Sequence, residues 1–249
     1  MPQGKDIGVV LSKKNSGEAD HICSIYTKNS GKETFIFRGL KKSTKRPRTA
    51  SEPGSILNII YYNGRDGRIN TISEFDILKN HSAIRKNSEK IFSLYFILEL
   101  VDLTTGLSDP NSKIFNLLSA GIETLYNTQN PKHFIIFFTI QYLMLQGVLP
   151  DISRCVWCGN NDAKALLIDD EKLRVSCLIC TDLNSALVKT KGTEFMNECV
   201  KNKFNKISCE NYSDNDIGSG LTTIIRYINH YFSIRLKTES FLTNTNSKL

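Results

Sequence analysis

The chain has 249 residues, of which 32 are basic and 25 acidic, so its formal charge is +7 and its pI is near 9.0. With 40% hydrophobic and 23% charged residues, it is not a disordered chain and has apolar material for one large or two small domains. It contains no apolar run of the roughly 20 residues that a transmembrane helix needs, and no signal peptide opens it. We therefore expect a soluble cytoplasmic protein without a membrane partner.

The first 80 residues have the pattern of five short β-strands separated by turns. The strands are predicted at 7–13, 21–27, 32–39, 55–62 and 68–76, with glycine-containing turn sequences between most of them. Five strands of this length are typical of a small closed barrel. An OB-fold has that strand count and size, and an SH3-like barrel fits the same pattern.

Most of the excess positive charge lies in these same residues. Residues 1–80 carry 14 basic and 8 acidic side chains, whereas 81–150 carry 5 of each and 151–249 carry 13 and 12. The segment 38–48, called the basic loop below, has six bases and no acid. Lys and Arg neutralise phosphates without reading sequence, so this segment predicts a phosphate-binding loop. A solvated loop and a nuclear-localisation signal are the alternatives. The candidate phosphate ligands are Arg38, Lys41, Lys42, Lys45, Arg46 and Arg48, with Lys32 as a weaker addition.

Aromatic side chains flank the basic loop. Phe35 and Phe37 precede it, and Tyr61 and Tyr62 follow it. Aromatic rings stack on unpaired bases in proteins that bind single strands, but rings at these positions also fill the core of a small barrel. For each ring taken alone, the core interpretation is favoured.

The rest of the chain has its apolar residues mainly at helical spacing. Three helices are predicted, and they are expected to form one bundle. The first has Ser88 as its N-cap and Glu89 in its first turn, the second spans 111–128, and the third opens at Pro131. A final helix is predicted at 219–237, after a loop at 206–220 that is rich in Asn, Ser, Asp and Gly.

Seven cysteines include two close pairs. Cys155 and Cys158 form one Cys-x-x-Cys turn, and Cys177 and Cys180 form another, with 18 residues between the pairs. Each turn supplies two thiolates, and a structural Zn²⁺ takes four tetrahedral ligands. The spacing therefore predicts one closed structural zinc site per chain, with no position for a catalytic water. Thiols without metal and a redox pair are the alternatives. The remaining cysteines are expected to be isolated thiols: Cys23, Cys199 and Cys209.

No catalytic motif is recognisable in the sequence. The phosphate-binding P-loop, the dinucleotide-binding glycine motif, the HExxH of zinc proteases and the GxSxG of hydrolases are all missing from it. The four histidines are scattered along the chain and none pairs with a nearby carboxylate in a recognisable motif. We expect no enzymatic activity and assign no catalytic residue.

Three groups of residues, taken in order, resemble the RecO family of recombination mediators. The first group is GEAD at 17–20, IYT at 25–27, GK at 31–32 and RG at 38–39, at the start of the basic loop. The second is LQGVLP at 145–150 followed by CVWCG at 155–159, and the third is YINHY at 227–231 followed by LKTESFL at 236–242. Thr238 is a mild departure, since the family usually has a Leu-Lys-Ser-like stretch there. The resemblance extends over almost the whole chain.

The resemblance implies an α+β architecture. An N-terminal five-stranded OB-fold barrel that binds DNA is expected at 1–80, and an α-helical domain at 81–150 and 183–249. A zinc module with four cysteine ligands is expected as an insertion in the helical domain at 151–182. Not all family members keep the four cysteines, so this sequence looks like the metal-binding branch.

The resemblance also implies a function without covalent chemistry. Members of the family bind single- and double-stranded DNA and anneal complementary strands. With RecR they help to load RecA onto DNA coated by single-strand-binding protein, whose acidic C-terminal tail they contact. The protein is accordingly expected in the cytoplasm, associated with the nucleoid. A zinc-ribbon module that binds protein within a transcription or translation assembly, and an unrecognised Mg²⁺-dependent nuclease, are the alternatives.

Overall fold

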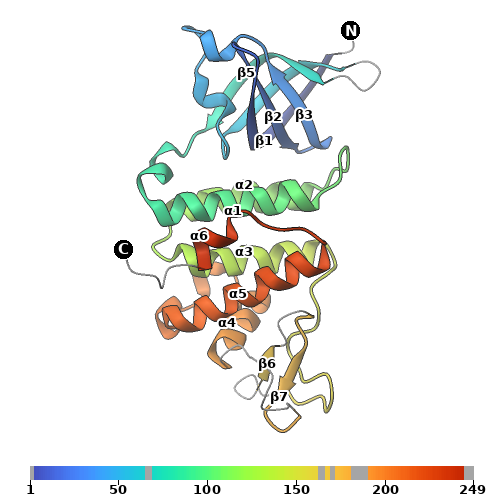
Figure 1. Cartoon of the computed structure of the whole chain (residues 1–249), viewed down its shortest axis with the longest axis vertical. Helices are drawn as coiled ribbons and strands as arrows, with labels where there is room; N and C mark the ends of the chain where they lie inside the picture. The colour runs from blue at the N-terminus through green and yellow to red at the C-terminus, as the bar shows by residue number, and fades with distance from the viewer. Residues whose placement is uncertain (1–2, 65–68, 162–165, 169–171, 181–189, 244–249) are drawn as a thin grey trace. The chain divides into compact units, whose positions relative to one another are not determined.

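The structure, a computed structural model, describes residues 3–64, 69–161, 166–168, 172–180 and 190–243 (Figure 1). The chain forms two compact units, Met1–Asn127 and Thr128–Leu249. Among the described residues, no helix is long and apolar enough to cross a membrane. The predicted domain boundaries at 80, 150 and 182 stay predictions.

The first unit begins with a closed five-stranded barrel. Its strands are β1 (Gln3–Ser16), β2 (Asp20–Thr27), β3 (Gly31–Phe37), β4 (Ile56–Tyr62) and β5 (Asn70–Lys79). The order around the barrel is β1-β2-β3-β5-β4, and β4 closes it by pairing with β1. All pairs are antiparallel except the short parallel contact between β3 and β5. The OB-fold prediction is confirmed.

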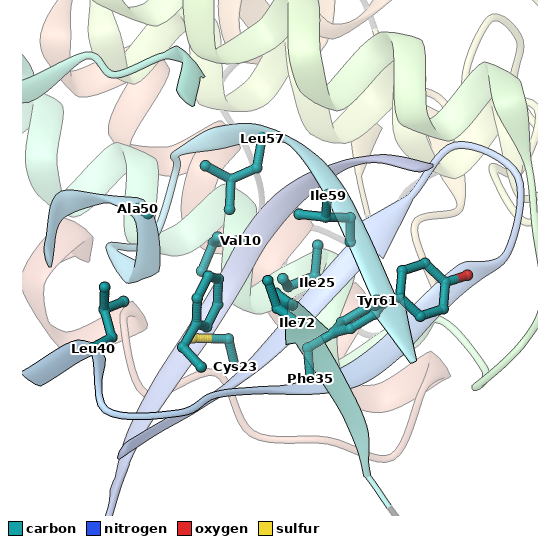
Figure 2. Packing of buried hydrophobic residues seen from close by; sticks show 11 residues of the cluster. Val10, Cys23, Ile25, Phe35, Leu40, Ala50, Leu57, Ile59, Tyr61 and Ile72 are labelled. Carbon is teal, nitrogen blue, oxygen red and sulfur yellow. The ribbon is translucent and has the colours of Figure 1, made fainter. Parts of the chain in front are cut away.

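Alternating apolar residues of these strands fill the barrel interior. Figure 2 shows the inward-facing side chains, with Phe35 and Tyr61 in edge-to-face contact at 5.0 Å between ring centroids. Phe37 is fully buried in the same core, whereas Tyr62 is exposed. The core interpretation is therefore confirmed for three of the four aromatic residues beside the basic loop. The fully buried members of this core are Val10, Cys23, Ile25, Phe35, Phe37, Leu40, Ala50, Leu57 and Ile59.

Two helices complete the first unit, α1 (Ser88–Thr104) and α2 (Ser112–Asn127). Ser88, predicted as the N-cap, is the first residue of α1. The N-cap is Asn87, whose side chain accepts a hydrogen bond from the Lys90 N–H at 2.9 Å. α1 packs against β1 of the barrel and against α2.

The second unit contains α3 (Pro131–Leu145), α4 (Thr190–Lys201), α5 (Asp214–Tyr231) and the short α6 (Glu239–Thr243). Pro131 opens α3 as predicted. Helices α3, α4 and α5 pack against one another. Helices α1, α2 and α3 were predicted to form one bundle. In the structure α1 and α2 belong to the first unit and α3 belongs to the second. Two antiparallel strands, β6 (Leu166–Ile168) and β7 (Val175–Cys177), lie in the segment that carries the two cysteine pairs, residues 155–180, called the cysteine module below.

One sequence prediction for this unit was wrong: the predicted loop at 206–220 is helical from Asp214 onward. Helix α4 lies within 183–249, which was expected to be helical, although no individual helix was predicted there. Ser213 forms a capping box with Asp216, each side chain accepting from the other residue's backbone N–H. Tertiary packing of α5 on α3 and α4 overrides the low helix propensity of its first turns.

Candidate nucleic-acid interface and metal site

The basic loop connects β3 to β4 and is fixed at both ends by buried side chains. It contains one short 3₁₀ turn, Leu40–Lys42, and leads into a second, Arg48–Ser51. Leu40 and Ala50 have no exposed surface and belong to the barrel core, as Figure 2 shows. The bases between these two anchors are therefore held on an ordered loop.

Hydrogen bonds hold the loop against the turn between β1 and β2. Gly39 has a φ of 65°, a conformation that glycine adopts without strain, and its N–H donates to Asp20 Oδ1 at 2.7 Å. The Lys41 N–H donates to the Ala19 carbonyl at 2.9 Å. The GEAD segment at 17–20 thus positions the backbone of the basic loop.

The acids of that segment also pair with two of the six bases. Arg38 Nη1 lies 3.2 Å from Asp20 Oδ2, and Lys42 Nζ lies 2.7 Å from Glu18 Oε2. The Arg38 and Lys42 side chains remain 66% and 63% exposed. Exposed pairs of this kind contribute only about 0–1 kcal/mol, so a phosphate can replace the acid at little cost.

Four of the six basic residues of the loop have no carboxylate partner in the described part of the chain: Lys41, Lys45, Arg46 and Arg48. Lys45 and Arg48 are exposed, and Lys41 is half-buried. Arg46 differs, because its guanidinium donates to the Arg38 carbonyl and its own N–H donates to Ser43 Oγ at 2.8 Å. The loop therefore presents uncompensated positive charge on a rigid backbone.

Lys32 is placed elsewhere by the structure. Its side chain is only 13% exposed, and its ammonium donates to the Asp102 carbonyl in the last turn of α1. The Asp102 carboxylate lies 3.9 Å away. Lys32 therefore contacts α1 and does not join the bases of the loop.

A buried histidine lies beneath the loop. His21 on β2 has Nδ1 2.8 Å from Ser51 Oγ. Burial lowers the pKa of His21, and the positive charges of Lys13, Lys41 and Arg48 lower it further, opposed by Glu52.

The two Cys-x-x-Cys turns come together in the second unit. The sulfur atoms of Cys155, Cys158, Cys177 and Cys180 all lie within 4.8 Å of one another. Cys158 and Cys177, from different turns, have their sulfurs 3.6 Å apart. Gly159 has a φ of 74°, and its N–H donates to the Cys155 carbonyl at 2.9 Å, so the chain curls tightly around the first pair.

The donor set fits a divalent cation that prefers thiolates. Desolvation raises the pKa of Cys155, but backbone N–H groups of Cys158, Cys177 and Trp157 lower it to about 6. The pKa of Cys177 is also lowered, chiefly by the Cys180 N–H, whereas hydrogen bonds with Cys177 and Cys158 raise that of Cys180 to about 12. A thiol must be deprotonated to ligate a metal ion, and a bound cation would favour the thiolate form of all four ligands.

The tips of both turns expose apolar side chains, which sequence reasoning had not singled out. The middle positions of the two Cys-x-x-Cys turns carry large apolar residues, and this pattern was the available signal. The exposed fractions are 49% for Val156, 70% for Trp157, 54% for Leu178 and 92% for Ile179.

The other cysteines and the buried His133 do not belong to the four-cysteine cluster. Cys23, Cys199 and Cys209 are buried in places separate from the four-cysteine cluster. His133 is buried against Phe195, with ring centroids 5.3 Å apart. Groups of three or more Cys, His, Asp or Glu that could hold a metal ion were found only at the four cysteines, within the described residues.

Comparison with known proteins gives two family matches. The family described as "Recombination protein O N terminal" matches residues 1–81, and "Recombination protein O C terminal" matches residues 85–240. A protein of Desulforamulus reducens called "DNA repair protein RecO" is 24% identical over 238 residues, 94% of this chain and 91% of that protein. The protein of the same name from Acetivibrio thermocellus is 24% identical over 210 residues, 82% of this chain and 81% of that protein. The one from Chlorobium phaeobacteroides is 26% identical over 158 residues, 63% of this chain and 60% of that protein.

Proposed function

This chain belongs to the RecO family, and from that membership together with the anchored basic loop we propose that it is a DNA-binding recombination mediator in DNA repair. The observation that supports this best is the set of basic residues without acid partners in the described part of the chain, Lys41, Lys45, Arg46 and Arg48, on a loop fixed by Leu40 and Ala50. Arg38 and Lys42 extend the same surface.

Phosphate binding by the loop explains how such a protein would anneal complementary strands. Two strands repel each other because each carries one negative charge per nucleotide. Lys and Arg side chains neutralise phosphates and release the counterions condensed on them. Phosphate contacts carry no sequence information, so the loop would bind both single- and double-stranded DNA. For the same reason it would accept any two complementary strands for annealing. Lys32 is left out of this surface because its ammonium contacts Asp102.

The partners implied by family membership belong to the same proposal. They are RecR, RecA acted on indirectly, and single-strand-binding protein through its acidic C-terminal tail. Strand annealing and RecA loading form and break no covalent bond in DNA. The proposed role therefore requires no catalytic residue.

We propose Zn²⁺ as the metal held by Cys155, Cys158, Cys177 and Cys180. Four thiolates are the usual ligands of a structural zinc site. When bound, the ion would cross-link the two cysteine turns, and it would have no open position for water. Its contribution would be to fix the module.

A strand-annealing assay tests the DNA proposal. Two complementary oligonucleotides, one with a fluorophore and the other with a quencher, are mixed with the intact protein. We expect faster annealing than in its absence, and a large loss of that acceleration in the K41A/K45A/R48A variant. A protein that neither binds nor anneals bare oligonucleotides would contradict the proposal. Degradation of the strands with Mg²⁺ would support the nuclease alternative instead.

The exposed apolar side chains at the tips of the two Cys-x-x-Cys turns favour a second role for the cysteine module, the binding of a protein. Exposed aromatic and aliphatic side chains grouped at one place are typical of the centre of a protein interface. The variant W157S/I179S is expected to keep oligonucleotide annealing and to weaken binding to a protein partner, measured with purified RecR. Unchanged RecR binding would remove this role for RecR.

A further inference from the structure

A cleft of about 350 Å³ lies on the outside of the barrel, between the basic loop and strands β4 and β5. One wall is formed by the loop and the other by the two strands. Its lining combines basic side chains, acidic side chains, small polar groups and apolar surface. The lining residues are Lys45, Arg46, Pro47, Asn58, Ile60, Ser73, Glu74, Phe75 and Asp76.

The strand register explains why the second wall is acidic. Asn58 is paired with Asp76, and Ile60 with Glu74. Cross-strand partners project to the same face. The residue between them on β4, Ile59, is fully buried in the core, so this set faces outward. The outer face of this strand pair therefore carries two carboxylates beside an amide and an aliphatic side chain.

A β-bulge shapes the centre of this wall. The register passes from Ile60 and Glu74 directly to Tyr61 and Ile72, which leaves Ser73 as the extra residue. Its hydroxyl donates to the Ile60 carbonyl at 3.0 Å. Bulges commonly redirect side chains next to binding sites.

The charges that face each other across the cleft are not paired. In the described part of the chain no ion pair joins Lys45 or Arg46 to Glu74 or Asp76, and the Arg46 guanidinium donates to the Arg38 carbonyl instead. Both signs of charge thus remain available to a ligand. A phosphate chain alone would be repelled by the carboxylates, and a purely basic ligand by Lys45 and Arg46. The ligand that fits this cleft carries both an anionic group and N–H donors.

A nucleotide has this combination of groups, and we propose that the cleft binds one nucleotide of a single DNA strand. Its phosphate lies at Lys45 and Arg46, and the amino group of its base donates to Glu74 and Asp76. Ile60 provides apolar surface for the base. This inference rests on the proposed DNA-binding function and adds base recognition to it. Carboxylates accept hydrogen bonds from the amino group of cytosine, for example.

The cleft suits an unpaired strand. In a duplex one hydrogen of each amino group is engaged in base pairing, whereas a single strand leaves the whole Watson–Crick edge free to face the carboxylates. Thymine has no amino group and would present carbonyl oxygens to the carboxylates. The cleft therefore favours oligo(dC) over oligo(dT) of equal length.

The test compares the affinities of the intact protein for fluorescently labelled oligo(dC) and oligo(dT) at one fixed salt concentration. The wild-type protein is expected to bind oligo(dC) at least about fivefold more tightly, the lower end of what a specific base contact contributes. In the E74Q/D76N variant that preference is expected to fall to about one. Both replaced residues are exposed, and circular dichroism verifies that the variant is folded.

A matched control separates base recognition from simple charge. E18Q removes an acid that pairs with Lys42 outside the cleft, so it should tighten binding of both oligonucleotides equally and keep the preference for oligo(dC). If E74Q/D76N also tightens both equally, or if the wild type shows no preference, the inference is wrong. A peptide carrying both charges would then be the better occupant of the cleft. Failure to bind either oligonucleotide would contradict the proposed DNA-binding function itself.

Discussion

The Lys32 ammonium donates to the main-chain carbonyl of Asp102 and lies 3.9 Å from the carboxylate of the same residue. The Asp102 carbonyl is in the last turn of α1, where carbonyl groups have no partner within the helix. A cation at this end is also stabilised by the helix dipole. The Ser24 hydroxyl donates to Asp102 Oδ1 at 2.7 Å, so β2 and β3 both reach α1 through this one residue.

We expect K32A to affect stability and not DNA binding. Loss of a part-buried, charged hydrogen bond should lower the free energy of unfolding by about 1–3 kcal/mol. Because Lys32 is outside the basic loop surface, the salt dependence of oligonucleotide binding should stay as in the wild type. Denaturant unfolding and binding titrations measure the two effects. The control is K28A at an exposed lysine, for which a change within about ±0.5 kcal/mol is typical.

Leu40 is expected to be required for the order of the basic loop. L40A removes a side chain with no exposed surface from the barrel core, which should cost about 2–5 kcal/mol. L78A truncates a leucine of β5 that is 50% exposed and should change the stability far less. Urea unfolding of both variants provides the comparison. Equal losses in the two variants would mean that Leu40 does not anchor the loop.

The sequence pattern predicted the barrel well because its signals are local. Alternating apolar residues and glycine turns lie within each strand pair, and all five strands were placed within a few residues. Helix α5 shows the opposite case. Asp, Asn and Gly dominate its first turns, but a Cβ on Gly220 would lie 3.4 Å from Met196 and 3.5 Å from Ile136. Gly220 therefore lies in close packing with side chains of α3 and α4, and such contacts between distant segments are not visible from neighbouring residues.

The candidate site likewise has features that local sequence predicts and features that depend on distant contacts. The spacing of the cysteines predicted their cluster, because each pair is a short local turn. The bases of the loop were recognised from composition, but their pairing with Glu18 and Asp20 depends on the contact between two distant turns. The contact of Lys32 with α1 joins it to Asp102, 70 residues further along the chain, and no local pattern predicts it.

Removing the metal should disorder the cysteine module. The change should alter the fluorescence of Trp157, the single tryptophan of the chain. We expect close to one zinc per chain by elemental analysis, and a change in tryptophan emission when a strong chelator is added. C158S should lose the metal, whereas C199A, at a buried cysteine outside the cluster, should keep it. Well under one zinc per chain after purification without chelator would reject zinc as the resident metal.

The stability of the first unit should fall in mild acid through His21. Burial and the nearby bases lower the pKa of His21 in the folded protein, so the unfolded chain binds a proton first as the pH drops below about 6.5. Stability is therefore lost as the pH falls through this range, until the folded protein is protonated too. H21N should flatten the profile of unfolding free energy between about pH 7 and pH 5. An unchanged profile would contradict this assignment.

The central claim is that the basic loop binds DNA phosphates, and the salt dependence of affinity tests it most directly. If all six bases neutralise phosphates of a single strand, log K falls with log[salt] with a slope of roughly −4. K41A/K45A/R48A should reduce that slope to roughly −2. The charge-matched control K201A/K203A/K206A, at exposed lysines of the second unit, should leave it unchanged. A slope that is the same in the basic loop variant and in the wild type would contradict the claim.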